Sequence, residues 1–198
     1  MSSPMADDRS ALLAADLARR AGGSRLAVYA AVRATARVPD PLVGLGVPLL
    51  AYVLGSVEEN PVRVTAVRGR HSAEGPLWGL GTQVEQWSLL IRCASELTIT
   101  VDVASGPWTT GVGPLELRVE WMHRERVITF RPTGATVASA APGAASLGLS
   151  GLEERLLGYA EEVVDLAADH ALPEELSAAA AIVSAARRSA ETGGPVDL

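Results

Sequence analysis

The sequence predicts an α+β fold with N-terminal helices, a central antiparallel sheet of about five strands, and two C-terminal helices packed on one face of that sheet. Two observations support this prediction. Between residues 83 and 131, apolar and polar residues alternate with the period of two that half-buried strands require. After residue 150, the apolar residues recur with the longer period of amphipathic helices. A chain of 198 residues is expected to form a single domain, residues 1–198.

Residues 6–57 are predicted to form a helical N-terminal region. Acidic residues near the start of 6–21, arginines near its end and the following Gly22 and Gly23 are typical of a helix. Ser24 can cap a second helix that ends before Pro39. The apolar run 42–54 is shorter than the roughly 20 residues that a bilayer span needs, so we expect a buried helix or packed loop and no membrane partner.

Part of this region resembles the helix-turn-helix of LacI-type repressors. The resemblance rests on the spacing of four residues, Ala18, Gly22, Ser24 and Val28. It implies that the segment 14–37 binds DNA, with the helix from Ser24 in the major groove. The residues that would contact DNA are Arg25, Tyr29, Arg33 and Arg37. An alanine-rich helical hairpin with a solvated arginine face explains the same spacing.

Residues 61–131 are predicted to form the antiparallel sheet. A connection of three residues, or a bulge, near Ala94 is expected to place Leu89 and Ile91 on the same side of the sheet as Ile99 and Val101. For the last two strands, we expect pairs whose residue numbers sum to 247. Leu117 then faces Phe130, and Glu116 faces Arg131.

The C-terminal third is predicted to contain a linker and two helices. Residues 132–149 are rich in Ala, Gly and Pro and carry no charge, which is typical of a linker. Residues 150–190 are predicted to form the two C-terminal helices, and Pro173 opens the second of them.

Composition and motifs exclude several function classes. The net charge of −6 disfavours indiscriminate binding to nucleic acid. All 17 basic residues are arginines, so a lysine Schiff base and the usual P-loop are excluded. The scattered histidines and the single Cys93 predict neither a metal site nor a disulfide, and no motif predicts a cofactor. The composition and the lack of a secretory signal are typical of a bacterial cytoplasmic protein.

Two tryptophans, Trp78 and Trp108, lie in glycine- and proline-rich segments between predicted strands. An aromatic side chain on a surface loop is a common anchor for a protein partner. The sequence therefore favours a non-catalytic protein-binding or assembly module of the chaperone or scaffold type, with a protein partner or a homo-oligomer such as a homodimer. Specific binding to DNA through residues 14–37 is one alternative.

The other alternative is a small enzyme or small-molecule-binding protein that uses the polar face of the sheet. In that case Asp102 could act as a general base, with His71 or His123 reaching over from a loop. Alternating charges on neighbouring exposed strands also arise from ordinary cross-strand pairing, which explains the same residues without catalysis.

Overall fold

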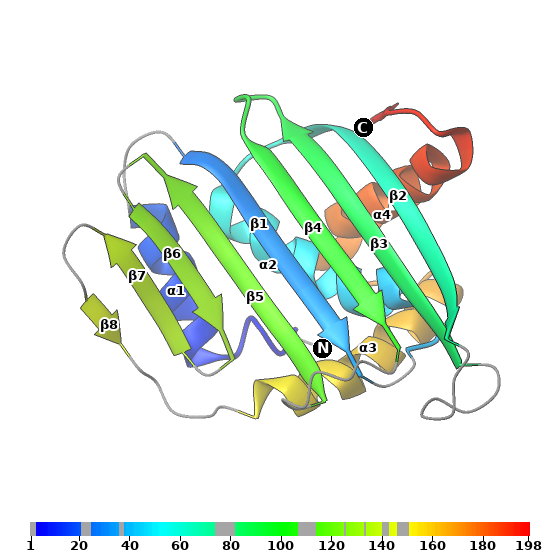
Figure 1. Cartoon of the computed structure of the whole chain (residues 1–198), viewed down its shortest axis with the longest axis horizontal. Helices are drawn as coiled ribbons and strands as arrows, with labels where there is room; N and C mark the ends of the chain where they lie inside the picture. The colour runs from blue at the N-terminus through cyan, green and yellow to red at the C-terminus, as the bar shows by residue number, and fades with distance from the viewer. Residues whose placement is uncertain are drawn as a thin grey trace.

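The computed structural model describes residues 3–20, 25–35, 38–73, 82–106, 114–124, 126–132, 134–139, 143–145 and 151–198, some of them by their backbone alone. These described residues form four α-helices, a short π-helical turn and nine strands. Figure 1 shows the strands as one twisted sheet with all the helices behind it, so one face of the sheet is open.

The sheet differs from the predicted five-stranded antiparallel sheet. Its order is β8-β7-β6-β5-β1-β4-β3-β2-β9, and it is mixed, because β1 (Arg25–Ala34) pairs in parallel with β4 (Thr98–Ser105). On its other side β1 is antiparallel to β5 (Leu115–His123). The N-terminal strand therefore lies between two runs of antiparallel strands, and the predicted fold class is wrong.

The prediction of a helix from Ser24 to Arg37, and with it the helix-turn-helix, is wrong because residues 25–34 form β1. Val28, Ala30 and Val32 are buried on the face that the helices cover, whereas Tyr29 and Arg33 lie on the open face. Small alanines on both faces weaken the period-two pattern in this stretch, so the local sequence is also compatible with a helix. Pairing on both sides with β4 and β5 decides the conformation.

The hairpin between β3 (Thr82–Cys93) and β4 is confirmed as predicted. Leu89 pairs with Val101 and Ile91 with Ile99. Cys93 N–H donates to Leu97 O at 2.9 Å, which leaves a three-residue connection whose last residue, Glu96, has a φ of 72°. A three-residue hairpin commonly has such a left-handed residue at its end.

The next hairpin has the expected faces but another register. Val119, rather than Leu117, pairs with Phe130 of β6 (Arg126–Arg131). The pair sum is therefore 249, a shift of two residues that keeps every side chain on its predicted face. Glu116 lies opposite Arg33 of β1 instead of Arg131.

The predicted linker 132–149 contains two short strands. These are β7 (Gly134–Ser139), which pairs with β6, and β8 (Gly143–Ala145), which pairs with β7. The linker prediction is wrong for these stretches. The small, uncharged side chains of this stretch give no strand signal of their own. Backbone hydrogen bonds between β7 and β6 determine the strand conformation, and the local sequence does not show them.

The remaining elements form the helical layer and the far edge of the sheet. The helices are α1 (Arg9–Arg20), α2 (Val47–Val57), α3 (Leu152–Ala168) and α4 (Glu174–Thr192), and the π-helical turn η1 (Leu42–Gly46) leads into α2. Strand β2 (Pro61–Ala73) lies between β3 and β9 (Val196–Asp197). No helix in the described part of the chain is long and apolar enough to cross a membrane.

The core lies between the helices and the covered face of the sheet. Trp121 and Phe130 are fully buried there and contact the ring of Tyr52, at centroid distances of 6.0 and 5.9 Å. Trp121 Nε1–H donates to Ser56 Oγ at 2.8 Å. This bond satisfies the polar group of the largest buried side chain.

Candidate functional site

The open face of the sheet carries the carboxylate that the sequence predicted as a general base. Asp102 lies near the centre of the sheet, where Tyr29 Oη donates to its Oδ2 at 3.0 Å and Ser88 Oγ donates to its Oδ1 at 2.7 Å. Both carboxylate oxygens are thus engaged. Partial burial, followed by the hydrogen bond to Asp102, raises the pKa of the Tyr29 hydroxyl, so it stays protonated as a donor.

The histidine expected to reach over Asp102 lies elsewhere. His123 is buried at the end of β5 on the helix-covered face, opposite the face that carries Asp102. A joint acid–base role for these two side chains is therefore wrong. The side chain of His71 lies outside the described residues.

Two of the predicted binding residues lie on the open face of β1. The exposed Arg33 is 3.9 Å from Glu116, and Tyr29 is bound to Asp102. Arg37, Trp78 and Trp108 lie outside the described residues, as does the side chain of Arg25. The structure therefore brings Tyr29 and Asp102 together but forms no cluster of the predicted residues as a whole.

A polar pocket of about 580 Å³ lies on the helix-covered side, between β2, β3, α4 and the segment after β1. Its lining residues are Pro39, Asp40, Arg68, Arg70, Glu85, Trp87, Arg187, Ala190 and Glu191. Val38 N–H donates to Ser105 Oγ at 2.7 Å, which holds the segment after β1 against the end of β4. Ligands often bind beyond the carboxyl ends of parallel strands, and β1 and β4 are such a pair.

One wall of the polar pocket is a rigid cluster around Glu85. Its Oε1 accepts hydrogen bonds from Arg68 Nε and from Trp87 Nε1, both at 2.9 Å, and Arg68 Nη2 lies 2.6 Å away. The Arg68 guanidinium also lies over the Trp87 ring, 4.9 Å from its centroid. These contacts fix a charged pair on an aromatic plane.

The opposite wall supplies a second ion pair and two uncommitted charges. Arg187 of α4 pairs with Asp40, whose Oδ1 also accepts from Val43 N–H at 3.3 Å. Among the described residues, Arg70 and Glu191 have no ion-pair partner. The pocket therefore combines three cations with three carboxylates and leaves one charge of each sign available to a ligand.

The buried face of β2 carries a sequence signal for this pocket. Val64 and Ala66 are buried, and the next residues with the same parity are Arg68 and Arg70. A strand whose inner face changes from apolar residues to arginines extends beyond its hydrophobic core. Arg187 and Asp40 could not be assigned to the pocket, because they approach from distant parts of the chain.

Comparison with known proteins found no matching protein family and no similar curated protein. Solved structures do match. GenD2 from gentamicin A biosynthesis, in complex with NAD, has a TM-score of 0.66 at 20% identity over 100% of this chain and 62% of that one. Levoglucosan dehydrogenase, in complex with NADH and levoglucosan, has a TM-score of 0.62 at 16% identity. The match covers 96% of this chain and 63% of that one.

Myo-inositol 2-dehydrogenase from Lactobacillus plantarum has a TM-score of 0.61 at 13% identity. The match covers 100% of this chain and 64% of that one. The chain thus spans less than two thirds of the length of these structures, and the likeness concerns the fold. Because the neighbours are dehydrogenases and oxidoreductases, they contradict the prediction of a non-catalytic protein-binding or scaffold module. These neighbours agree better with the alternative prediction of a small enzyme or small-molecule-binding protein.

The described residues do not fit the NAD that two of these neighbours bind. A dinucleotide usually lies on a glycine-rich turn between a parallel strand and a helix. Among the described residues, the segment most like such a turn is η1, which contains Gly44 and Gly46 and precedes α2. A Cβ on Gly44 would lie 2.7 Å from Ala160 O of α3. A Cβ on Gly46 would lie 3.3 Å from Leu42 and 3.4 Å from Val103. Both glycines allow close helix packing and leave no space for a pyrophosphate.

In the described part of the chain, no group of three or more His, Cys, Asp or Glu side chains could hold a metal ion. In the polar pocket, arginine donors and carboxylate acceptors converge.

Proposed function

We propose that this chain is the small-molecule-binding domain of an oxidoreductase, and that it binds a neutral, polyhydroxylated substrate in the polar pocket. The observation that carries the proposal is the likeness of the whole chain to dehydrogenases, among them enzymes named for levoglucosan and for myo-inositol. The single Cys93, which is buried and reduced, supports a cytoplasmic location.

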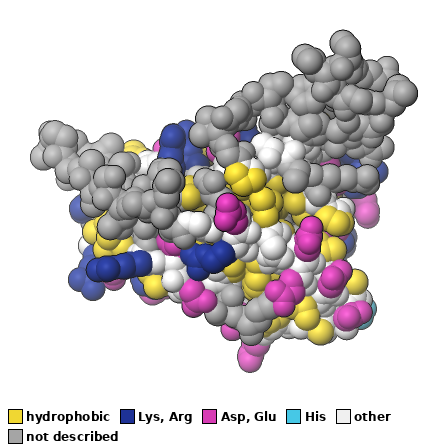
Figure 2. Space-filling view, turned by 90° about the horizontal axis from the view of Figure 1, so that it is seen from below, with side chains coloured by type: hydrophobic (Ala, Val, Ile, Leu, Met, Phe, Trp, Pro, Cys, Tyr) yellow, Lys and Arg dark blue, Asp and Glu magenta, His cyan; other side chains and the backbone are white. Residues whose placement is uncertain are grey.

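The lining of the polar pocket matches a polyol better than an anion. Each hydroxyl group both donates and accepts a hydrogen bond, and the pocket presents arginine donors beside carboxylate acceptors. Its volume lies within the range of about 300–1,000 Å³ typical of small-molecule sites. Acidic side chains recur over the right-hand and lower parts of Figure 2. Within the polar pocket, the carboxylates of Asp40, Glu85 and Glu191 disfavour an anionic ligand.

The lining residues take two roles in this proposal. Arg70 donates to substrate oxygens and Glu191 accepts from substrate hydroxyls, because neither is committed to an ion pair among the described residues. The Arg68–Glu85 and Asp40–Arg187 pairs hold the walls in place. An ordered wall lowers the entropy lost when a ligand binds.

Two of the neighbours are in complex with NAD or NADH, and the described residues of this chain do not fit such a group. The role of the chain is therefore to hold and orient the substrate. A nicotinamide cofactor would be held by residues other than those described, and it would supply the hydride acceptor.

The test is ligand-observed NMR with levoglucosan and myo-inositol, followed by titration calorimetry. We expect both polyols to bind to the wild type, and Arg70→Ala to weaken binding by about tenfold, the loss of a charged hydrogen bond. Arg63→Ala is the matched control. Arg63 lies on the same strand but pairs with Asp197 at the sheet edge, so its removal should leave affinity unchanged.

Two results would contradict the proposal. One is the absence of polyol binding at millimolar concentration, and the other is equal loss of affinity in the Arg63 and Arg70 variants.

A further inference from the structure

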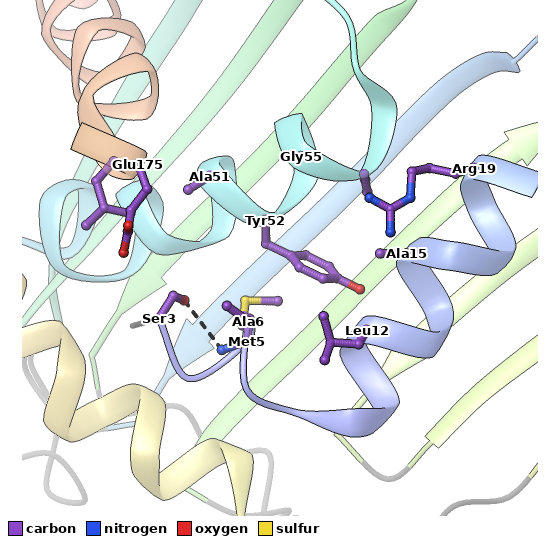
Figure 3. Close-up of a pocket in the computed structure, with 12 residues that line it drawn as sticks. Ser3, Met5, Ala6, Leu12, Ala15, Arg19, Ala51, Tyr52, Gly55 and Glu175 are labelled. Carbon is purple, nitrogen blue, oxygen red and sulfur yellow. Dashed lines mark hydrogen bonds between the residues drawn. The ribbon is translucent and has the colours of Figure 1, made fainter. Parts of the chain in front are cut away.

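A second pocket, of about 410 Å³, lies on the outer side of the helical layer. Figure 3 shows it as a groove between α2 on one side and α1 with the preceding N-terminal residues on the other. We call it the apolar pocket. It shares no lining residue with the polar pocket, so it does not rest on the function proposed above.

The walls of the apolar pocket are hydrophobic. Met5, Ala15 and Leu176 are almost completely buried along its floor. Tyr52 contributes its ring, because its hydroxyl donates to Ala11 O at 2.8 Å. Burial raises the pKa of this hydroxyl, and it remains a protonated donor to α1.

The two charged side chains of the apolar pocket lie at its two ends. In Figure 3, the Arg19 side chain extends from α1 toward the last turn of α2, and Glu175 of α4 stands at the far end. Neither side chain has an ion-pair partner among the described residues. The adjacent Arg20 differs, because it pairs with Asp16 of its own helix at 2.9 Å.

We propose that the apolar pocket binds an elongated apolar molecule that carries one carboxylate, such as a medium-chain fatty acid, with the carboxylate on Arg19. A guanidinium presents parallel donors to a carboxylate, and hydrocarbon packs against the Met5 and Tyr52 walls. The acidic Glu175 at the other end disfavours the reverse orientation. Basic side chains are visible on the left of Figure 2, the side on which α1 lies in Figure 1.

The structure provides a reporter for this pocket and a residue with which to fill it. Ser56 lines the pocket and accepts the hydrogen bond of the buried Trp121 indole, so a bound ligand should shift the Trp121 Nε1–H signal. Gly55 also lines the pocket, and a Cβ built on it meets nothing within 4 Å. Gly55→Leu therefore fills the pocket and also favours the helix.

The experiment titrates decanoate, below its micelle concentration, into the full chain by calorimetry and by ¹⁵N NMR of the indole signals. We expect saturable binding and a shift of the Trp121 signal, which Trp121→Phe identifies by its loss. Arg19→Gln should weaken binding by about tenfold or more, and Arg20→Gln should leave it unchanged. Gly55→Leu should abolish binding.

Decanol separates carboxylate recognition from general hydrophobic binding, because it has the same chain without the charge. Equal affinity for decanol and decanoate would overturn the proposal, as would unchanged binding in Arg19→Gln or Gly55→Leu. Circular dichroism checks that each variant is folded. Arg70→Ala should bind decanoate normally, so failure here is distinct from failure of the polyol proposal.

Discussion

At the scale of single residues, the chain uses hydrogen bonds to hold polar groups within its packed layers. Ser189 Oγ of α4 accepts from Ala66 N–H of β2 at 2.9 Å and donates to Gly194 O at 2.6 Å. The buried Asp8 accepts from Ala11 N–H at the start of α1 and pairs with Arg155 of α3 at 3.1 Å. The Ser189–Ala66 and Asp8–Arg155 contacts join elements distant in the sequence, which periodicity alone could not indicate.

Cys93 gives a pH prediction at this scale. Its thiol is 2% exposed, and burial, followed by the charge of Glu59, raises its pKa from 9.0 to about 11. The folded state then holds a proton that the unfolded state has released, so stability falls as pH rises from about 9 to about 11. The thiol contributes at most about 1.4 kcal/mol per pH unit to this fall.

Urea unfolding between pH 8 and pH 11 measures this effect as the difference between the wild type and Cys93→Ala. Below pH 9 the difference should be constant, and above it the wild type should lose stability faster than the variant. Rapid reaction of native Cys93 with a thiol reagent at pH 8 would contradict its burial.

At the scale of elements, strands with one wet face were predictable and β1 was not. The clear alternation in β3, β4 and β5 placed Leu89, Ile91, Ile99, Val101 and Leu117 on the correct face. The predicted register of β5 and β6 was wrong by two residues. It paired Glu116 with Arg131, whereas Glu116 faces Arg33 on β1, a strand that the local sequence assigned to a helix. In the candidate site, the sequence of β2 shows that its buried face changes from apolar residues to Arg68 and Arg70. It does not show that Asp40 and Arg187 lie in the same pocket.

A matched pair of substitutions tests the strand assignment of β1. Ala30 is fully buried on the covered face, whereas Ala27 is partly exposed on the open one. Ala30→Val should destabilise the protein by about 1–3 kcal/mol through overpacking. Ala27→Val should change stability by less than about 0.5 kcal/mol. Urea denaturation measures both, and equal costs would refute the alternation of faces.

At the scale of the whole molecule, β1 joins two blocks of strands. One block runs from β5 to β8 and the other comprises β4, β3, β2 and β9. Both blocks depend on this central strand for backbone hydrogen bonds at their inner edges. An open inner edge favours pairing with other chains.

Deleting residues 1–35 should therefore abolish the single cooperative unfolding transition and cause aggregation. A deletion of residues 196–198 is the control, because β9 lies at the outer edge of the sheet and its Arg63–Asp197 pair is exposed. That control should lose no more than about 1 kcal/mol. A synthetic peptide of residues 25–35 added to the larger deletion should restore solubility. A soluble, cooperative 36–198 fragment would show that β1 does not join the blocks.

The central position of β1 also sets the order in which the protein can fold on the ribosome. This strand is synthesised before both of its neighbours, which begin only at Thr98 and Leu115. At about 5–20 residues per second, several seconds separate its emergence from that of its partners. During that interval an apolar strand has no native edge to join. The nascent chain should therefore need a chaperone, or transient cover from α1 and α2, until β5 has been made.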